Sequence, residues 1–520
     1  MGEQKDNTSV YFLIYSGLLA LVLILSTELH KRPRLSSILS EAALVLLVGM
    51  TVSFIIAFIF LIKQEYGSEL PDDDSVAETQ LAYSIVSFEP QVFFNAMLPP
   101  ILFNSGYQLR RELFYRHITP IALFACLGTA ISALTTGFFL YGIKLAGLMG
   151  AFKPTLIELL VFGSLLSATD TVSVLAVFQA KRVDPHLFYV VFGESALNDA
   201  VAIVLFNIFS RFLVSDAVAN MTSVARLTGE LVMDVSLEAI GSPVLGFVSS
   251  FTAALIFKHG DMKHNAILEL SLYFLLMYFP FILAENIRLS GIVTIFFSGI
   301  FARRYIEPNV SEETKRNADV IFKLVAYLAE TSIFLELGLS VFGHIGSYHW
   351  PFIAWAFLAA LVSRALSIYP ISFYYNWSLT EEIPSMDSLV EMSDDGCDAS
   401  SHHSNPVCFR KRIIPEHRRD KKITVPMMHV MWFAGMRGAV AYACAKEFPD
   451  IHGIRDEMIA STMTIVLVMI IAMGGATGPL LEYLQIKMNV DEEEYMREWH
   501  RKRKLKGVFH EFGKNHHFEI

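Results

Sequence analysis

The sequence predicts an all-α membrane protein of about thirteen transmembrane helices, and three observations lead to this prediction. Only 18% of the 520 residues are charged and 53% are hydrophobic, whereas soluble domains average about 25% charged residues. Apolar runs recur along the chain at the length, roughly 20 residues, that an α-helix needs to cross the ~30 Å hydrocarbon layer. Lysine and arginine gather in every second loop between these runs. Together these features are typical of a polytopic membrane protein.

Each apolar run is interpreted as one membrane span. The first run is read as a retained helix and not as a cleaved signal peptide, because acidic residues precede it and no small-x-small cleavage site follows. The spans are predicted near residues 10–29, 39–62, 91–107, 117–144, 155–179, 186–213, 229–257, 266–284, 289–304, 317–343, 351–375, 425–446 and 456–484.

The charges of the loops predict the orientation. Loops after odd-numbered spans are rich in lysine and arginine, whereas loops after even-numbered spans are poor in both, and the segment 64–80 is acidic. The positive-inside rule then places the odd loops and the C-terminus in the cytoplasm and the N-terminus outside. In this orientation the sequons at Asn7 and Asn220 lie on the non-cytoplasmic side and are candidate glycosylation sites, whereas those at Asn309 and Asn376 do not.

The chain divides into spans 1–11 in residues 1–375, a loop 376–424, spans 12–13 in 425–484, and a short charged tail 485–520. The loop begins acidic and serine-rich and ends basic, which predicts a mobile, regulatory cytoplasmic segment.

Several classes of function are excluded by what the sequence does not contain. No basic excess indicates nucleic-acid binding, no cofactor motif occurs, and no nucleophile–base or zinc motif of a hydrolase is found in the spans. Four cysteines are too few and too scattered for a disulfide framework. They are Cys126, Cys397, Cys408 and Cys444.

The fifth span contains a polar stretch around Asp170. Serine and threonine side chains compete for backbone hydrogen bonds, so the helix could unwind here. Unwound backbone at membrane depth is tolerated where it lines a cavity, and its freed carbonyls can bind a cation. The alternative is a straight helix in which Asp170 bonds a neighbouring helix.

The sixth span carries Glu194, Asn198 and Asp199. Glu194 and Asn198 share one helix face, and Asp199 lies about 100° further round. Two carboxylates this close require a counter-charge, and Arg364 and Arg437 are the candidates because both stand in apolar runs. A pairing of Glu194 with an arginine would serve assembly of the helix bundle, since removing one partner of a buried pair typically costs about 3–5 kcal/mol.

Asp199 is then the carboxylate without a fixed partner. In a narrow aqueous cavity such a group can hold a proton or a hard cation, which prefers oxygen ligands, but not both. This competition would couple a proton flux to a cation flux. The alternative is a purely structural aspartate.

A second interruption, at 435–439 in span 12, resembles the one in span 5. Paired interruptions of this kind point to a site between two broken helices at the membrane midplane. Asp170 near helix N-termini and Arg437 near helix C-termini would balance the helix dipoles; the alternative for Arg437 is a second buried ion pair. Glu330 in span 10 either joins this polar network or stands outside it, and Glu336 has no assigned role.

Four stretches resemble the eukaryotic sodium/proton exchangers, and a fifth resembles their endosomal, or organellar, branch most closely. The GES-x-x-ND string is the most specific of them. They are FNAMLPPILFNSGY at 94–107, SATDTVSVLAVF at 167–178, FGESALNDAVAIV at 192–204, FAGMRGAVAY at 433–442, and SRALSIYPIS at 363–372 followed by MWF at 431–433.

The resemblance implies an antiporter fold of two inverted repeats with two discontinuous crossing helices, a dimerisation domain and a core that moves as an elevator. It also implies electroneutral exchange of one cation for one proton and a homodimer. The implied roles are ion and proton binding at Asp199, Asn198, Asp170 and Thr169, a buried pair Glu194–Arg364, charge compensation by Arg437, polar support from Ser195 and Glu330, and an inhibitor-sensitive region at Phe94 and Leu98.

The sequence departs from the family pattern in two places. Thr171 stands where proline usually follows the crossover aspartate, which could loosen the break. The tail is also shorter than in plasma-membrane members, and this favours the organellar branch.

We therefore expect a secondary antiporter that exchanges Na⁺ or K⁺ for H⁺ in an endosomal or Golgi-type membrane, with the plasma membrane as the alternative location. Its expected partners are these ions, membrane lipid and a second copy of the chain, without any cofactor. The rival interpretations are a cation channel, a non-transporting membrane sensor and an intramembrane enzyme. The residues leave open the preference between Na⁺ and K⁺ and the organelle served.

Overall fold

The computed structural model describes residues 2–32, 39–66, 90–109, 111–150, 152–214, 221–260, 262–287, 289–344, 348–381 and 422–497. These residues form helices and connecting turns and contain no strand. Most of the predicted loop 376–424 and the end of the predicted tail lie outside the described residues.

A helix, or a run of two or three consecutive helical elements, lies at each predicted span. Eight of the described helices are individually long and apolar enough to cross a membrane, so the all-α polytopic class is confirmed while the number of thirteen stays a prediction. The elements are α1 (Gly2–His30), α3 (Glu41–Tyr66), α5 (Pro90–Val92), η1 (Phe93–Met97), α6 (Leu98–Gln108), α7 (Arg111–Arg116), α8 (Ile118–Ala122), η2 (Leu123–Gly128), α9 (Thr129–Leu145), α10 (Leu156–Ser167), α11 (Val172–Ala180), α12 (Pro185–Val214), α13 (Met221–His259), α14 (Ala266–Asn286), α15 (Gly291–Tyr305), η4 (Glu307–Asn309), α16 (Glu312–Leu339), η5 (Val341–His344), α17 (Trp350–Glu381), α19 (Val425–Phe433), α20 (Ala439–Lys446) and α21 (Arg455–Tyr483).

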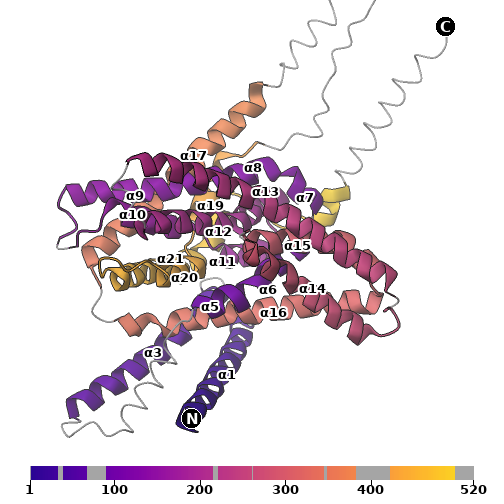
Figure 1. The fold of residues 1–520 in the computed structure, drawn as a ribbon, viewed down its shortest axis with the longest axis horizontal. Helices are drawn as coiled ribbons and strands as arrows, with labels where there is room; N and C mark the ends of the chain where they lie inside the picture. Colours follow the sequence, from indigo (N-terminus) through magenta and orange to yellow (C-terminus); the bar gives the residue numbers. More distant parts are fainter. Residues whose placement is uncertain are drawn as a thin grey trace, which may run out of the picture.

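The helices form two bodies. In the first, which we call the core body, α8 to α12 pack with α17, α19, α20 and α21; in the second, the scaffold body, α3 and α6 pack with α13 to α16. Figure 1 shows α9, α10, α20 and α21 on the left and α13, α14 and α15 on the right. The bodies meet where α12 contacts α15, α16 contacts α20, and α21 contacts α3.

Two interrupted helices cross inside the core body. Residues 168–171 separate α10 from α11, and residues 434–438 separate α19 from α20. The two breaks touch directly, because the backbone N–H of Asp170 donates to the carbonyl of Met436 at 2.8 Å. Gly438 makes this approach possible, since a Cβ there would lie 2.1 Å from the Asp170 Cβ. The predicted pair of discontinuous crossing helices is thus present.

The residues of α10 account for both of its ends. Thr155 caps its N-terminus in a reciprocal capping box with Glu158, which satisfies otherwise unpaired N–H groups. Near the C-terminus the hydroxyls of Ser164 and Ser167 bond back to carbonyls three residues earlier, at 2.6 Å each. Such local bonds compete with the helix ladder. The chain leaves the helix at Ala168, which has an extended backbone with ψ 127°.

Two prolines interrupt the hydrogen-bond ladder of the helix at the third span. Pro99 lacks the N–H that would bond the carbonyl of Asn95 in a regular helix, and the turn before it widens into the π-helical element η1. The Tyr278 hydroxyl of α14 donates to this Asn95 carbonyl. A tyrosine of the neighbouring helix therefore satisfies the acceptor that proline leaves unpaired.

α17 continues to Glu381, beyond the end near residue 375 that the sequence predicted. In this extension the Asn376 side chain bonds both backbone groups of Ile423, accepting from the N–H at 2.9 Å and donating to the carbonyl at 2.7 Å. The two ends of the long loop are thereby held side by side.

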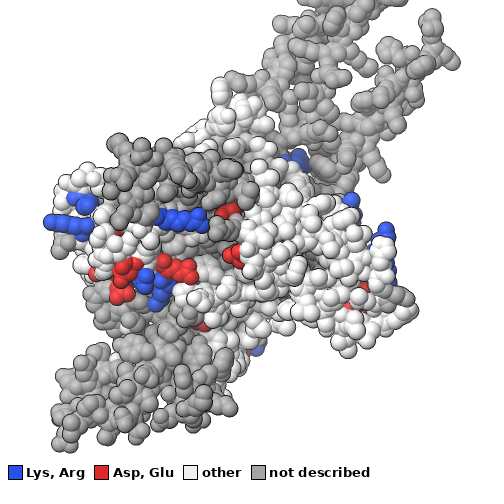
Figure 2. All heavy atoms as spheres, in the orientation of Figure 1, with Lys and Arg blue, Asp and Glu red and all other residues white. Residues whose placement is uncertain are grey.

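The outer surface fits a lipid environment. Figure 2 shows a broad area without Lys, Arg, Asp or Glu side chains over the part formed by α13, α14 and α15. Large apolar side chains are exposed there, among them Phe251, Leu275 and Phe279. Exposed apolar area of this extent marks a membrane or protein contact, in agreement with the polytopic membrane class.

Gly438→Ala should damage the crossing. Its Cβ would overlap the Asp170 side chain, and overpacking of a tight site typically costs about 1–3 kcal/mol. Thermal unfolding in detergent should show a lower midpoint. Gly142→Ala in α9 is the matched control, since its added Cβ meets no atom within 4 Å. Equal stability of the two variants would contradict the close crossing.

Thr171→Val should stabilise the protein. Thr171 is buried, and its hydroxyl has no hydrogen-bond partner among the described residues; leaving such a group unpaired costs about 1–3 kcal/mol. Valine keeps the shape and removes the unpaired oxygen, so the unfolding midpoint should rise. A fall in the midpoint would show that the hydroxyl has a partner, such as water, beyond the described residues.

Candidate functional site

Asp199 lies in α12 beside the helix crossing. It is partly exposed, and no hydrogen bond or ion pair of its carboxylate is present among the described residues. The carboxylate of Asp170 is within electrostatic range of it. Neither Arg364 nor Arg437 bonds Asp199, since both are engaged elsewhere. The group that the sequence singled out is therefore an acid without a counter-charge next to the broken helices.

Asn198, one residue earlier, is buried and fully engaged by the protein. Its amide donates to the carbonyl of Ser167 at 3.2 Å and to the hydroxyl of Thr169 at 2.6 Å. Its oxygen accepts from the hydroxyl of Thr129. Asn198 thus ties α12 to the break in α10 and to α9, and its polar atoms are occupied by protein partners in this conformation.

Ser195 lies one turn before Asp199 on the same helix. Its hydroxyl donates to the carbonyl of Thr169 at 3.0 Å. Thr169 belongs to the unwound stretch, so its carbonyl has no helix partner of its own. Ser195 and Asn198 together fix the orientation of Thr169 beside Asp199.

Glu194 and Arg364 form a buried ion pair. The guanidinium of Arg364 holds the carboxylate with two parallel hydrogen bonds, from Nη1 to Oε1 and from Nη2 to Oε2, the latter at 3.1 Å. Arg364 also donates to the carbonyl of Met431 near the end of α19, at 3.2 Å. This bidentate pair joins α12 to α17 and to the second interrupted helix, and it leaves Asp199 outside.

Arg437 is buried in the second break and lies over carbonyls. It donates to the carbonyl of Ser167 at the C-terminal end of α10 and to that of Ala360 in α17, both at 3.4 Å. Glu194 and Arg364 lie within its electrostatic range. A cation at this position offsets the negative end of the α10 dipole.

Two acids in the second half of α16, Glu330 and Glu336, lie where the scaffold body approaches the core body. Glu330 is within electrostatic range of Asp170 across the boundary and of Glu41 in α3. Glu336 lies within electrostatic range of Tyr15 of α1 and of Tyr442 of α20. Glu330 therefore faces the break, whereas Glu336 lies further along α16, at its contact with α1 and α20.

The remaining sequence-predicted sites are distributed away from the crossing. Phe94 lies in η1, and Leu98 is buried at the start of α6. Asn7 belongs to α1 with its side chain outside the described residues, and Asn220 lies outside them altogether.

Thr129 is the site residue that the sequence analysis missed. It bonds Asn198, and Ser132, one turn later, contacts Ser363 of α17 at 3.2 Å. Thr129, Ser132 and Thr136 are all buried, and their spacing of three and four residues places them on one helix face. This polar stripe in an otherwise apolar span is the signal that could have identified Thr129.

The arrangement collects oxygen atoms around one unpaired carboxylate. Asp199, Asp170 and Ser195 lie next to the Thr169 carbonyl, and oxygen atoms are the ligands that hard cations prefer. The described residues contain no group of three or more His, Cys, Asp or Glu side chains that could hold a metal ion. An arrangement of this kind can bind a cation or a proton.

Comparison with known proteins agrees with this chemistry. Residues 17–483 match the family described as sodium/hydrogen exchanger, transmembrane. The chain is 33% identical over 490 residues to sodium/hydrogen exchanger 8 of Homo sapiens, covering 93% of this chain and 73% of that protein. It is 34% identical over 428 residues to sodium/hydrogen exchanger 9 of Rattus norvegicus, covering 79% of this chain and 58% of that protein.

The fold has a solved counterpart in the sodium proton antiporter MjNhaP1 from Methanocaldococcus jannaschii at pH 8. The TM-score is 0.59 at 17% sequence identity, over 91% of this chain and 99% of that one. At this identity the likeness concerns the fold alone, and it confirms the predicted antiporter architecture. The family match and the identity to the exchangers go further: this chain belongs to the transmembrane sodium/hydrogen exchangers, which are secondary Na⁺/H⁺ antiporters and not enzymes.

Proposed function

We propose that Asp199 is the group on which the two ions of the exchange compete, and that the exchange is electroneutral. One observation carries the proposal: Asp199 is a partly exposed carboxylate with no bonded partner among the described residues, beside a helix break whose neighbouring polar groups are engaged. Such a group binds either a proton or a cation. Because the two exclude each other, inward and outward passages of the loaded carboxylate exchange one ion for the other.

The cation shell proposed here consists of Asp199, the Ser195 hydroxyl and the Thr169 carbonyl. That carbonyl accepts one hydrogen bond from Ser195, and a carbonyl oxygen has a second lone pair available. Asp170 would act from slightly further away, through water or through its charge. The ligands are all oxygen atoms, so the site suits Na⁺ and K⁺ alike, and we propose that either ion can be carried.

The proposed one-to-one stoichiometry follows from which groups can change charge. The Asn198 amide does not gain a proton near neutral pH, and it is already bonded to Thr169. Asp170 lies two residues before the N-terminus of α11, where the helix dipole favours a negative charge. Asp199 is then the group that alternates between a bound proton and a bound cation. Each cycle therefore exchanges one monovalent cation for one proton.

Alternating access would occur at the boundary of the two bodies. The crossing and Asp199 belong to the core body, while Glu330 faces them from the scaffold body. We propose that the core body moves against the scaffold body and carries the site from one side of the membrane to the other. The internal bonds of the crossing, the Glu194–Arg364 pair among them, would travel with it unchanged.

We also propose the membrane in which the protein lies, its orientation and its oligomeric state. The organellar character of the sequence motifs and the similarity to exchangers 8 and 9 favour an endosomal or Golgi-type membrane. The alternation of basic loops favours a cytoplasmic C-terminus, and the exposed apolar surface of the scaffold body favours a homodimer embedded in lipid. In this orientation a cytosolic cation enters as a luminal proton leaves.

Asp199→Asn should abolish exchange, because an amide holds neither a proton nor a charge-paired cation. The measurement is sodium-driven proton flux in proteoliposomes with the membrane voltage clamped at several values; the wild-type flux should not depend on voltage. Asp319→Asn, which breaks an exposed pair with Lys323 on α16, is the control and should keep the wild-type rate. Voltage-driven cation current without proton flux would instead support a channel.

Ser195→Ala should weaken cation binding more than it slows turnover. The half-saturating sodium concentration should rise about fivefold to tenfold, the effect of losing one net hydrogen bond of ~1 kcal/mol or slightly more. Ser271→Ala is the matched control, because the exposed Ser271 hydroxyl of α14 bonds only within its own helix. An unchanged half-saturating concentration would remove Ser195 and the Thr169 carbonyl from the proposed shell.

A further inference from the structure

The chain after α21 does not leave the bundle but runs along the turn between α11 and α12. Three backbone hydrogen bonds fix it there. The N–H groups of Asn489 and Val490 donate to the carbonyls of Lys181 and Arg182, at 3.0 and 2.9 Å, and the N–H of Asp184 donates to the carbonyl of Lys487 at 3.0 Å. We call residues 486–497 the strap.

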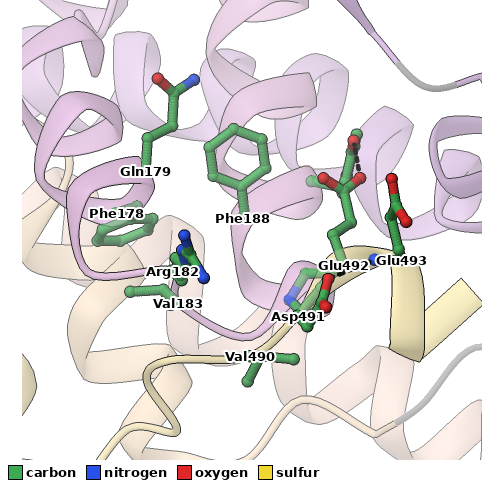
Figure 3. Close-up of a pocket in the computed structure, with 11 residues that line it drawn as sticks. Phe178, Gln179, Arg182, Val183, Phe188, Val490, Asp491, Glu492 and Glu493 are labelled. Atoms are coloured by element: carbon green, nitrogen blue, oxygen red, sulfur yellow. Dashed lines mark hydrogen bonds between the residues drawn. The ribbon is translucent and has the colours of Figure 1, made fainter.

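Side chains add to this attachment. The Tyr189 hydroxyl of α12 donates to the carboxylate of Glu492 at 2.8 Å, which is the dashed bond in Figure 3. Asp491 caps the short helix that begins at residue 492, accepting from the N–H of Glu493 at 2.9 Å. The strap thus turns into a helix directly after its contact with the core body.

The helical end of the strap reaches an apolar cluster to which the scaffold body contributes. Tyr495 and Met496 pack against an apolar cluster that is separate from the main hydrophobic core. This cluster includes Ile121 of α8 in the core body together with Phe296 and Ile300 of α15 in the scaffold body. The strap therefore starts on one body and ends on a cluster that both bodies share.

A hollow separates part of the strap from the core body. A cavity of about 440 Å³ lies between it and the α11–α12 turn. Figure 3 shows Gln179, Phe188 and Arg182 on the α11–α12 side of this space and Asp491 to Glu493 on the strap side. Where atoms do not touch, dispersion attraction is lost, so the hydrogen bonds carry the attachment beside the hollow, with the buried Ile486 before it and Tyr495 and Met496 after it.

We propose that the strap is a brake: it joins the core body to the scaffold body at this end of the bundle and so slows the movement on which exchange depends. The inference rests on the alternating-access movement proposed above. Any displacement of the core body against α15 must either separate Tyr495 and Met496 from the shared cluster or break the hydrogen bonds at 181–184. Tyr495 and Met496 are only partly buried, so the helical end of the strap can leave the shared cluster and return to it within the cycle.

Two variants test the brake from opposite ends. Val490→Pro removes the N–H that bonds the Arg182 carbonyl, and Tyr495→Ala with Met496→Ala removes the contact with the shared cluster. Each should raise the initial rate of sodium-driven proton flux per protein in proteoliposomes. For Val490→Pro the expected rise is about fivefold, the factor produced by losing one net hydrogen bond. The half-saturating sodium concentration should stay unchanged, because the site near Asp199 is untouched.

The control is Glu482→Gln, which breaks an ion pair with Lys181 between α21 and α11. Both of these helices belong to the core body, so this variant should keep the wild-type rate. Hydrogen exchange should show that Asn489 loses backbone protection in Val490→Pro but keeps it in the control.

The outcomes separate the two proposals. An active wild type whose strap variants are slower, or equally fast with a lower unfolding midpoint, would overturn the brake and leave the exchange mechanism standing. A wild type that shows no sodium-driven proton flux would overturn the proposed function and the brake with it.

Discussion

The structure depends on a contact between two places where helices are absent. One break separates α10 from α11 and the other separates α19 from α20. The backbone of one break bonds the backbone of the other through Asp170 and Met436. Unpaired backbone groups are expensive in a membrane, so each break must be satisfied by the rest of the bundle. Arg437, Asn198 and Ser195 do this by bonding carbonyls of the first break. The same bonds that make the interruption tolerable place oxygen atoms around Asp199.

The balance of charge follows from that requirement. Three acids and two arginines lie close to the crossing, and the geometry assigns their roles by contact. Arg364 is committed to Glu194 in a bidentate pair, and Arg437 is committed to carbonyls at a helix end. No arginine is left for Asp199. In the proposed mechanism a carboxylate that exchanges its occupant has to stay without a permanent cation, and the other partners of both arginines leave Asp199 in that state.

Sequence reasoning reached the fold class, the positions of the spans and the two interruptions, because each has a strong local signal. Apolar length marks the spans, and polar residues or glycine inside them mark the breaks. The pairing of Glu194 with Arg364 rather than Arg437 was not decided by the residues alone, since both arginines stand in similar apolar runs and only the family resemblance separated them. Thr129 was missed because its partner lies in another helix, 69 positions along the chain. The docking of the strap was also missed, since three backbone bonds leave no trace in side-chain composition.

The two hydrogen bonds between Asn376 and Ile423 isolate the helix bundle from the conformation of the long loop. One side-chain amide joins the two ends of the loop. The spacing of α17 and α19 is therefore set by these hydrogen bonds and not by the number of residues between the helices. Closure entropy grows only slowly with loop length. The length and sequence of this loop can therefore change during evolution, and recognition sites for modifying enzymes can arise in it, while the helices around the proposed ion site keep their geometry.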